Sequence, residues 1–282
     1  MPDIATPSWA RLVSKKADPL VLVRDGPGPT LYVFHDLLGG VDSYSHLAQL
    51  LERRVCGLQV PTAKLLPTAI SVGEVAASYA RRLQRAQPTG NFLLCGWCAG
   101  AVLALETAAQ LRAAGRQVQL LVAIDGAPWN VIRETGLWYY GHLLYWLCKR
   151  SPHWIGVLGR SGTLSAAGRS VVKRWRLLRN DLAGSSDEFY RRRNPEELPE
   201  AVVQYAERLL VALHAHAPKP YGGPLQVYIA TKYDFPYRRR DCIWRTLAPQ
   251  CDILPVAGTR HGDILDPRGA EIIARHLRQR LP

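Results

Sequence analysis

A pentapeptide at residues 96–100, Gly-Trp-Cys-Ala-Gly, constrains this chain more than any other feature. The apolar run 91–95 precedes it, and the helix-forming run 101–109 follows it. This order predicts a strand that turns sharply into a helix, with Cys98 at the turn. A side chain at either glycine would collide with the strand or helix packed beside it, because such a turn is tight and strained. The motif therefore predicts a cysteine presented as a nucleophile.

The rest of the chain alternates apolar runs with helical patterns, which is typical of a mostly parallel sheet flanked by helices. Strands are expected at residues 20–23, 30–34, 55–60, 91–95, 119–125, 225–230 and 253–256. Helices are expected at residues 43–53, 72–87, 101–114 and 269–281. Together with the nucleophile turn, this alternation predicts an α/β-hydrolase fold.

The alternation breaks down after Asp125 and resumes only at Leu225. The stretch between them holds five of the eight tryptophans and several arginine-rich runs, and its pattern is mainly helical. We interpret it as a helical lid, at about residues 127–215, inserted after the sixth strand. The lid would belong to a single domain of residues 18–282, which follows a linker of residues 1–17.

Three aromatic residues of the expected lid are candidates for substrate binding: Trp129, Trp138 and Trp146. The simpler interpretation is that most of the tryptophans pack helix against sheet. The lid as a whole would still cover the site.

A nucleophilic cysteine needs a base within hydrogen-bond reach, and that base needs a carboxylate to orient it. His261 suits the role of base because it lies in the loop between the last expected strand and the closing helix. His35 is its rival, since its loop also approaches the site. Two residues remain candidates for the carboxylate that orients the base. Asp125 ends the strand that follows the nucleophile's helix, and Asp234 follows the next strand.

Acyl chemistry also needs N–H donors for the negative charge that develops on the carbonyl oxygen. The amide of Ala99, directly after the nucleophile, is one candidate. The second should come from the loop at residues 35–40, where Gly39 and Gly40 let the backbone approach closely. We expect the amide of Leu37 to be this donor.

Composition limits the setting and the partners. The formal net charge of +13 suits nucleic acid, an anionic lipid surface or an acidic protein, and charge alone does not choose among them. No apolar stretch reaches the length of a membrane span, and no secretion signal begins the sequence. The six cysteines show no spacing that suits a metal, so we expect reduced thiols in a cytoplasmic protein.

Taken together, these motifs resemble the type I thioesterase domains that end nonribosomal peptide synthetases and polyketide synthases. Residues 34–40 are similar to the family's Phe-His-Pro-x-Gly-Gly loop. Residues 87–100 are similar to its Gln-Pro-x-Gly-x-Tyr-x-Leu-x-Gly-Trp-Ser-x-Gly segment, with Cys98 in place of serine. Residues 218–223 and 244–247 resemble later family blocks.

The resemblance implies a thioesterase whose acid follows the sixth strand, which favours Asp125 over Asp234. It also implies an acidic acyl or peptidyl carrier protein as partner, with no cofactor beyond the phosphopantetheine that delivers the substrate. Two positions depart from the family pattern. Asp36 replaces a proline, and His261 lies one residue later than in the family's Gly-Asp/Asn-His.

Cysteine in place of serine changes the expected chemistry. Transfer of an acyl group from a phosphopantetheine thiol to Cys98 exchanges one thioester for another, so the acyl enzyme keeps its activation. We expect release by cyclisation, to a lactone or lactam that includes strained rings, or by transfer to an amine. The alternatives are hydrolysis to the free acid, an editing thioesterase, and a catalytically silent binding module. Nucleic-acid or anionic-membrane binding would leave the motif at residues 96–100 unexplained.

Overall fold

The computed structural model describes residues 19–60, 70–128, 200–232 and 240–282. The chain divides into two units, one made of Met1–Val131 and Leu198–Pro282 and the other of Ile132–Glu197. All described residues belong to the first unit. The expected linker and most of the expected lid, with its three candidate tryptophans, lie outside them, so both stay predictions.

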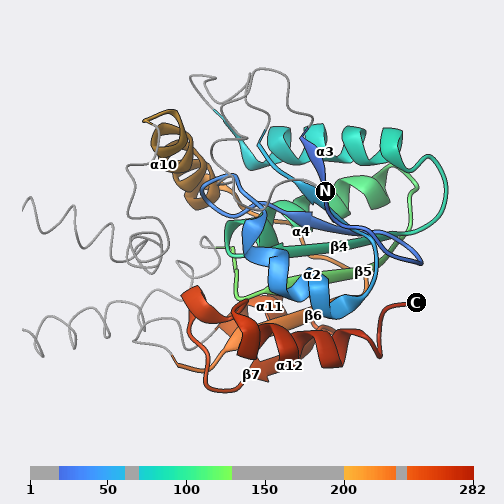
Figure 1. The fold of residues 1–282 in the computed structure, drawn as a ribbon. Coiled ribbons are helices and arrows are strands. Elements are labelled where there is room, and N and C mark those ends of the chain that lie inside the picture. The colour runs from blue at the N-terminus through green and yellow to red at the C-terminus, as the bar shows by residue number, and fades with distance from the viewer. Residues whose placement is uncertain (1–18, 61–69, 129–199, 233–239) are drawn as a thin grey trace, which may run out of the picture. The chain divides into compact units, whose positions relative to one another are not determined.

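A seven-stranded sheet is the centre of the described part of the first unit (Figure 1). The strands are β1 (Leu20–Arg24), β2 (Leu31–Phe34), β3 (Val55–Leu58), β4 (Phe92–Trp97), β5 (Val118–Ile124), β6 (Leu225–Ala230) and β7 (Asp252–Val256). Their order is β1-β3-β2-β4-β5-β6-β7, with β1 antiparallel to β3 and every other pair parallel. The mostly parallel sheet that the sequence predicts is therefore confirmed.

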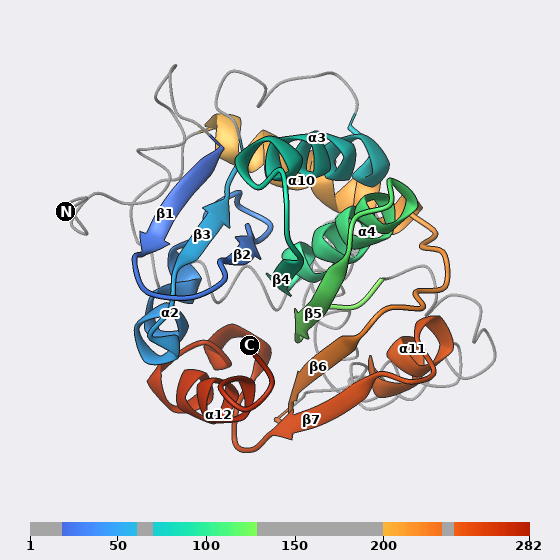
Figure 2. The ribbon, with the colours of Figure 1, turned by 90° about the vertical axis from the view of Figure 1, so that its right-hand side faces the viewer.

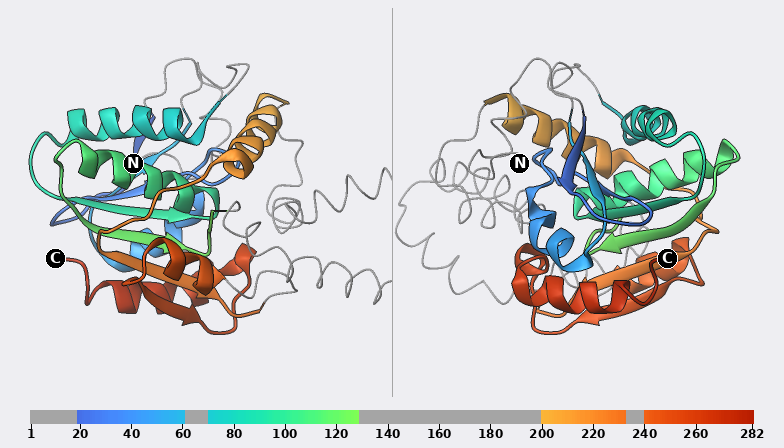
Figure 3. Two further views of the ribbon diagram at one scale, coloured as in Figure 1. Left: turned by 180° about the vertical axis from the view of Figure 1, so that it is seen from behind. Right: turned by 45° about the vertical axis from the view of Figure 1, so that its right-hand side comes forward.

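Helices cover both faces of this sheet (Figure 2). On one face lie α3 (Val72–Ala86), α4 (Ala99–Ala113) and α10 (Glu200–Ala215), and on the other lie α2 (Ser45–Leu51) and α12 (Pro267–Leu277). The same two layers are visible from behind in Figure 3. Strands β2 and β4 are buried along their whole length because helices cover them on both sides.

Most expected helices form close to their predicted ends. Helix α3 is capped by Ser71, whose hydroxyl accepts a hydrogen bond from the Glu74 N–H at 3.2 Å, as the capping pattern predicts. The expected helix at residues 43–53 is divided into a 3-10 turn, η1 (Asp42–Tyr44), and the helix α2.

Three features differ from the sequence-based expectation. The expected lid follows β5, the fifth strand of the described residues and not the sixth. Its last part forms α10, which belongs to the same unit as the sheet. Helix α11 (Arg240–Leu247), beside β6, was not expected, because eight residues are too few for a clear helical period.

Among the described residues, no helix is long and apolar enough to span a membrane.

Candidate active site

The nucleophile turn lies where β4 passes into α4. Cys98 has φ 56° and ψ −123°, a backbone conformation that L-residues rarely adopt. Its N–H donates to the Ile124 carbonyl at 3.1 Å, and its own carbonyl accepts from the Ala101 N–H at 3.2 Å. The Cys98 side chain is partly exposed, so a substrate can reach the thiol.

Both glycines of the motif are required by close backbone contacts. A Cβ atom on Gly96 would lie 2.0 Å from the Gly100 carbonyl oxygen, and one on Gly100 would lie 2.6 Å from the Phe34 oxygen. The steric role that the sequence predicts for these glycines is thus confirmed.

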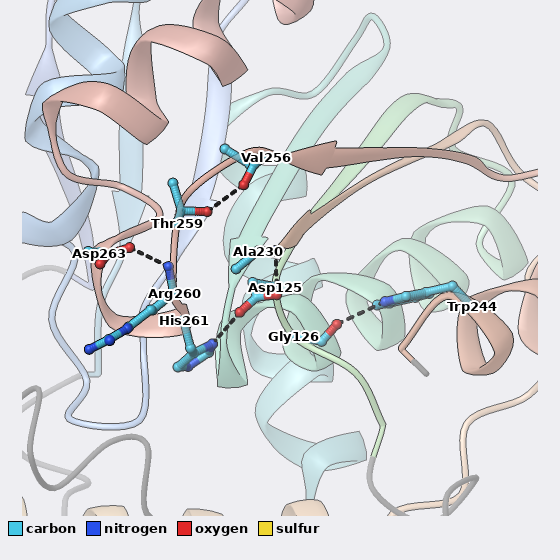
Figure 4. A network of polar contacts seen from close by, with 9 residues as sticks. All are labelled: Asp125, Gly126, Ala230, Trp244, Val256, Thr259, Arg260, His261 and Asp263. Atoms are coloured by element: carbon cyan, nitrogen blue, oxygen red, sulfur yellow. Dashed lines mark hydrogen bonds and ion pairs between the residues drawn. The ribbon is translucent and has the colours of Figure 1, made fainter. Parts of the chain in front are cut away.

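Asp125 and His261 meet at the same edge of the sheet (Figure 4). The Nδ1 atom of His261 lies 2.7 Å from Oδ2 of Asp125, whose other oxygen accepts from the Ala230 N–H at 3.0 Å. Both carboxylate oxygens are thereby fixed, and Asp125 itself is fully buried. The sequence alone left Asp125 and Asp234 as alternatives. The structure places Asp125 against His261, whereas Asp234 lies outside the described residues.

His261 also contacts the nucleophile. Burial lowers its pKa, but the charge of Cys98, hydrogen bonds to Asp125 and Cys98, and the charge of Asp125 together raise that pKa to about 9. The imidazole is therefore held in its protonated form at neutral pH. The structure brings the thiol, imidazole and carboxylate into contact in the order Cys98, His261, Asp125.

A loop held by side-chain hydrogen bonds carries His261. The Thr259 hydroxyl donates to the Val256 carbonyl at 2.8 Å, and the Arg260 N–H donates to Oδ1 of Asp263 at 2.5 Å (Figure 4). These bonds hold the backbone on both sides of His261. The carboxylate of Asp263 thus belongs to the histidine loop and not to the cap of the closing helix. Asp266 occupies the N-cap position of α12.

Two supporting aromatic residues were missed by the sequence reasoning. The Trp97 ring stacks on His261 at a centroid distance of 5.4 Å and an angle of 27°, which favours an imidazolium. Trp244 of α11 donates its indole N–H to the Gly126 carbonyl at 2.9 Å and so holds the turn after Asp125. Trp97 belongs to the motif, but no local signal indicates which ring it would contact.

His35, the rival base, is engaged elsewhere. Its Nδ1 lies 2.6 Å from the Asp36 carbonyl oxygen, and its Nε2 lies 3.5 Å from the Tyr205 hydroxyl. Burial lowers the pKa of His35 to about 4, so the ring is neutral and Nδ1 donates to the carbonyl. The position of His35 gives it a role in holding its own loop.

The two amides expected to stabilise an oxyanion lie in the β2 loop and at the start of α4. Within the described part of the chain, neither the Leu37 nor the Ala99 N–H donates to a backbone carbonyl. The hydroxyl of Tyr44 donates to the Phe34 carbonyl at 2.8 Å and accepts from the Trp97 N–H at 2.6 Å. This bridge ties the end of β2 to the nucleophile turn and was not foreseen from the sequence.

The described residues contain no group of three or more His, Cys, Asp or Glu side chains that could hold a metal. The five cysteines among them, at positions 56, 95, 98, 242 and 251, are free thiols.

Comparison with known proteins adds to this geometry. Residues 29–137 match the family model for the thioesterase domain. The match covers β2 to β5, and so includes the nucleophile turn and Asp125.

Among relatives of this segment, enterobactin synthase component F of Escherichia coli K12 is 34% identical over 123 residues, 41% of this chain and 10% of that protein. Bikaverin polyketide synthase bik1 of Gibberella fujikuroi is 36% identical over 98 residues, 34% of this chain and 5% of that protein. The chain thus spans a tenth or less of the length of these relatives.

A solved structure of the NocB thioesterase domain, in covalent complex with a fluorophosphonate nocardicin G analogue, is similar at a TM-score of 0.58 and 24% identity. The likeness covers 90% of this chain and 95% of that one. At this level of identity it shows the fold, and it confirms the predicted α/β-hydrolase fold.

Proposed function

We propose that this chain is a thioesterase that takes an acyl or peptidyl chain from the phosphopantetheine thioester of a carrier protein onto Cys98. One observation carries the proposal. The partly exposed thiol of Cys98 is hydrogen-bonded to the His261 ring, and Nδ1 of that ring is hydrogen-bonded to the buried carboxylate of Asp125. Such a Cys-His-Asp arrangement is the form that nucleophilic acyl transfer requires. The thioesterase match over residues 29–137 supports the same reaction class.

In the first step, the Cys98 thiolate attacks the thioester carbonyl and forms a tetrahedral intermediate. The amide N–H groups of Ala99 and Leu37 would stabilise its oxyanion. The carbon–sulfur bond to phosphopantetheine then breaks, and the His261 imidazolium gives its proton to the departing sulfur. The products are an acyl-Cys98 thioester and a free phosphopantetheine thiol. The raised pKa of His261 suits this step, because a protonated ring must wait beside the thiolate.

In the second step, the neutral His261 takes a proton from an acceptor group as that group attacks the acyl carbonyl. Cys98 leaves as a thiolate, and the imidazolium is regenerated. An acceptor within the acyl chain gives a lactone or lactam, and a separate amine gives an amide. Water as acceptor would give the free acid, which is the alternative outcome of release or editing.

A cysteine nucleophile favours cyclisation or amide formation over hydrolysis. The acyl-Cys98 thioester keeps the activation that a serine ester would lose, so it can drive a weak acceptor or the closure of a strained ring such as a β-lactone or β-lactam. The Cys98→Ser variant distinguishes release by cyclisation or amide formation from release by hydrolysis. We expect it to shift release from cyclisation or amide formation toward hydrolysis, whereas an unchanged product and rate would remove the reason for cysteine.

Intact-mass spectrometry with acyl N-acetylcysteamine thioesters tests the nucleophile directly. We expect one acyl group on the natural chain and none on Cys98→Ala. Cys242→Ala is the matched control, since Cys242 is an exposed free thiol outside the site, and it should be acylated normally. Acylation that persists in Cys98→Ala would overturn the proposal. A silent binding module would instead show no acylation and no selective labelling of Cys98 by iodoacetamide.

The net charge of +13 supports an acidic carrier protein as partner. Added salt should raise the KM for a carrier-bound acyl group and leave that for an N-acetylcysteamine thioester unchanged. Equal effects on both substrates would contradict steering by charge.

We further propose that no cofactor resides in the chain and that the enzyme acts in the cytoplasm. We also propose that Trp129, Trp138 and Trp146 contact the acyl chain.

A further inference from the structure

One residue closes the loop that follows β2. The Asp36 N–H donates to the Gly40 carbonyl at 3.1 Å, and the Asp36 carbonyl accepts from the Gly39 N–H at 3.1 Å. Its side chain adds two more contacts. Oδ1 accepts from the Leu38 N–H at 2.9 Å, and Oδ2 lies 3.5 Å from the Ser43 hydroxyl, which donates to it.

These contacts decide which amide of the loop is left for a substrate. The N–H groups of Asp36, Leu38 and Gly39 are all used inside the loop. In the described residues the Leu37 N–H has no such acceptor. The carboxylate holds the amide directly after Leu37, so it fixes the peptide plane next to the one that carries the Leu37 N–H.

The same position holds proline in the thioesterase pattern that this chain resembles. Proline has neither an N–H to donate to Gly40 nor a carboxylate to accept from Leu38. This loop is therefore held by hydrogen bonds that a proline at position 36 could not form. Asp36 is only 6% exposed, which is unusual for a carboxyl group without a structural or functional task.

We propose that Asp36 is a positioning residue that orients the Leu37 N–H toward the oxyanion through its hold on Leu38 and Gly40. This inference rests on the proposed function, because it concerns the first acyl transfer to Cys98. Asp36 touches no substrate atom, and it acts only through the loop.

The charge of Asp36 makes this support depend on pH. Burial raises its pKa to about 7, against the hydrogen bonds from Leu38, Gly40 and Ser43, which lower the pKa. The ionised carboxylate, which is the stronger acceptor, is therefore lost as the pH falls through 7.

Among the residues that the structure describes, the groups that face Asp36 come from the end of β2 and from η1. They are the neutral His35 ring, the hydroxyls of Ser43 and Tyr44, and the carboxylate of Asp42, which also raises the pKa of Asp36. None of them supplies a cation to Asp36, so the loop amides stabilise its negative charge.

The test compares two reactions of the same thiol. Alkylation of Cys98 by iodoacetamide needs the thiolate but no oxyanion site, whereas acylation by an N-acetylcysteamine thioester needs both. The ratio of the acylation rate to the alkylation rate therefore removes the reactivity of the thiolate from the comparison. His261 stays able to give its proton from pH 6 to pH 8, because its pKa of about 9 lies above this range, so a change in the ratio reports the loop. It is measured from pH 6 to pH 8 for the natural chain, Asp36→Ala, Asp36→Asn and the control Asp42→Asn.

We expect Asp36→Ala to lower this ratio by about 10- to 100-fold, because the loss of one oxyanion donor costs on that order. Asp36→Asn keeps an oxygen acceptor for Leu38 and should restore most of the ratio. The natural ratio should rise as the pH passes 7, whereas Asp36→Asn should show no such rise. Asp42→Asn should keep the natural ratio at pH 8 but move its rise to lower pH, because the charge of Asp42 raises the pKa of Asp36.

Other outcomes are equally decisive. A natural ratio in Asp36→Ala, or an unchanged pH profile in Asp36→Asn, would overturn the role of Asp36 while leaving the proposed function intact. If Asp36→Ala does not fold, the Asp36→Asn profile decides the question. Failure of the proposed function would look different, since the natural chain itself would then resist acylation.

Discussion

The nucleophile turn and the histidine loop meet in one site, yet they are held in place by different physical means. At the turn, Gly96 and Gly100 pack so closely on neighbouring backbone that no side chain fits. In the histidine loop, the hydroxyl of Thr259 and the carboxylate of Asp263 hold the backbone by hydrogen bonds. Steric contact tolerates almost no change, whereas hydrogen bonds can be rearranged around an added residue. We therefore expect substitutions at the glycines of the turn to cost more stability than substitutions in the histidine loop.

Gly96→Ala tests the steric side of the comparison and should have the largest effect. Its Cβ atom would lie 2.0 Å from the Gly100 carbonyl oxygen, and the rigid turn cannot move away. We expect a loss of at least about 3 kcal/mol in the free energy of unfolding, measured by urea denaturation. Gly73→Ala in α3 is the control, because nothing lies within 4 Å of its added Cβ. If the Gly96→Ala chain is as stable as this control, the backbone of the turn can move to make room for a side chain.

Asp125→Asn tests whether the carboxylate matters for chemistry more than for stability. An amide at this position keeps the shape but removes the negative charge that helps to hold the imidazole in its protonated form. We expect the acylation rate to fall by about 10³- to 10⁴-fold, as in other enzymes with this arrangement. The measurement is single-turnover acylation of Cys98 by an N-acetylcysteamine thioester. A fall of less than tenfold would mean that another acid orients His261, and Asp234 would be the first to examine.

Thr259→Val tests whether hydrogen bonds hold the histidine loop in place. The substitution keeps the volume of the side chain but removes the shorter of the two hydroxyl hydrogen bonds to the Val256 carbonyl, leaving only that from Thr231 at 3.4 Å. We expect a loss of about 1–2 kcal/mol in the free energy of unfolding and a severalfold fall in the alkylation rate of Cys98. Thr259→Ser restores the hydroxyl and should recover most of both. Equal behaviour of the valine and serine variants would show that the loop does not depend on this bond.

The same contrast explains which parts of the molecule could be predicted from the sequence. The motif at residues 96–100 and the parallel strands were predictable, because glycine sterics and apolar runs are local in sequence. The choice between Asp125 and Asp234 was not, since each follows a strand at the same edge of the sheet. The stacking of Trp97 on His261 was also hidden, because the two residues come together only in the folded chain.

The smallest expected effect is on the pH dependence of the free energy of unfolding. It concerns His261, in the loop that is held by hydrogen bonds. The folded-state pKa of about 9 lies above the ordinary value of 6.5, so this residue stabilises the fold fully below pH 6.5 and loses its contribution as the pH rises through 9. Between pH 7 and pH 8 the natural chain should lose about 1 kcal/mol more than His261→Gln. Cys98→Ala should also show a smaller loss than the natural chain, because the charge of Cys98 is the largest cause that raises this pKa. If Cys98→Ala keeps the full slope, then Asp125 alone sets the protonation of His261, and the thiol and imidazole titrate independently.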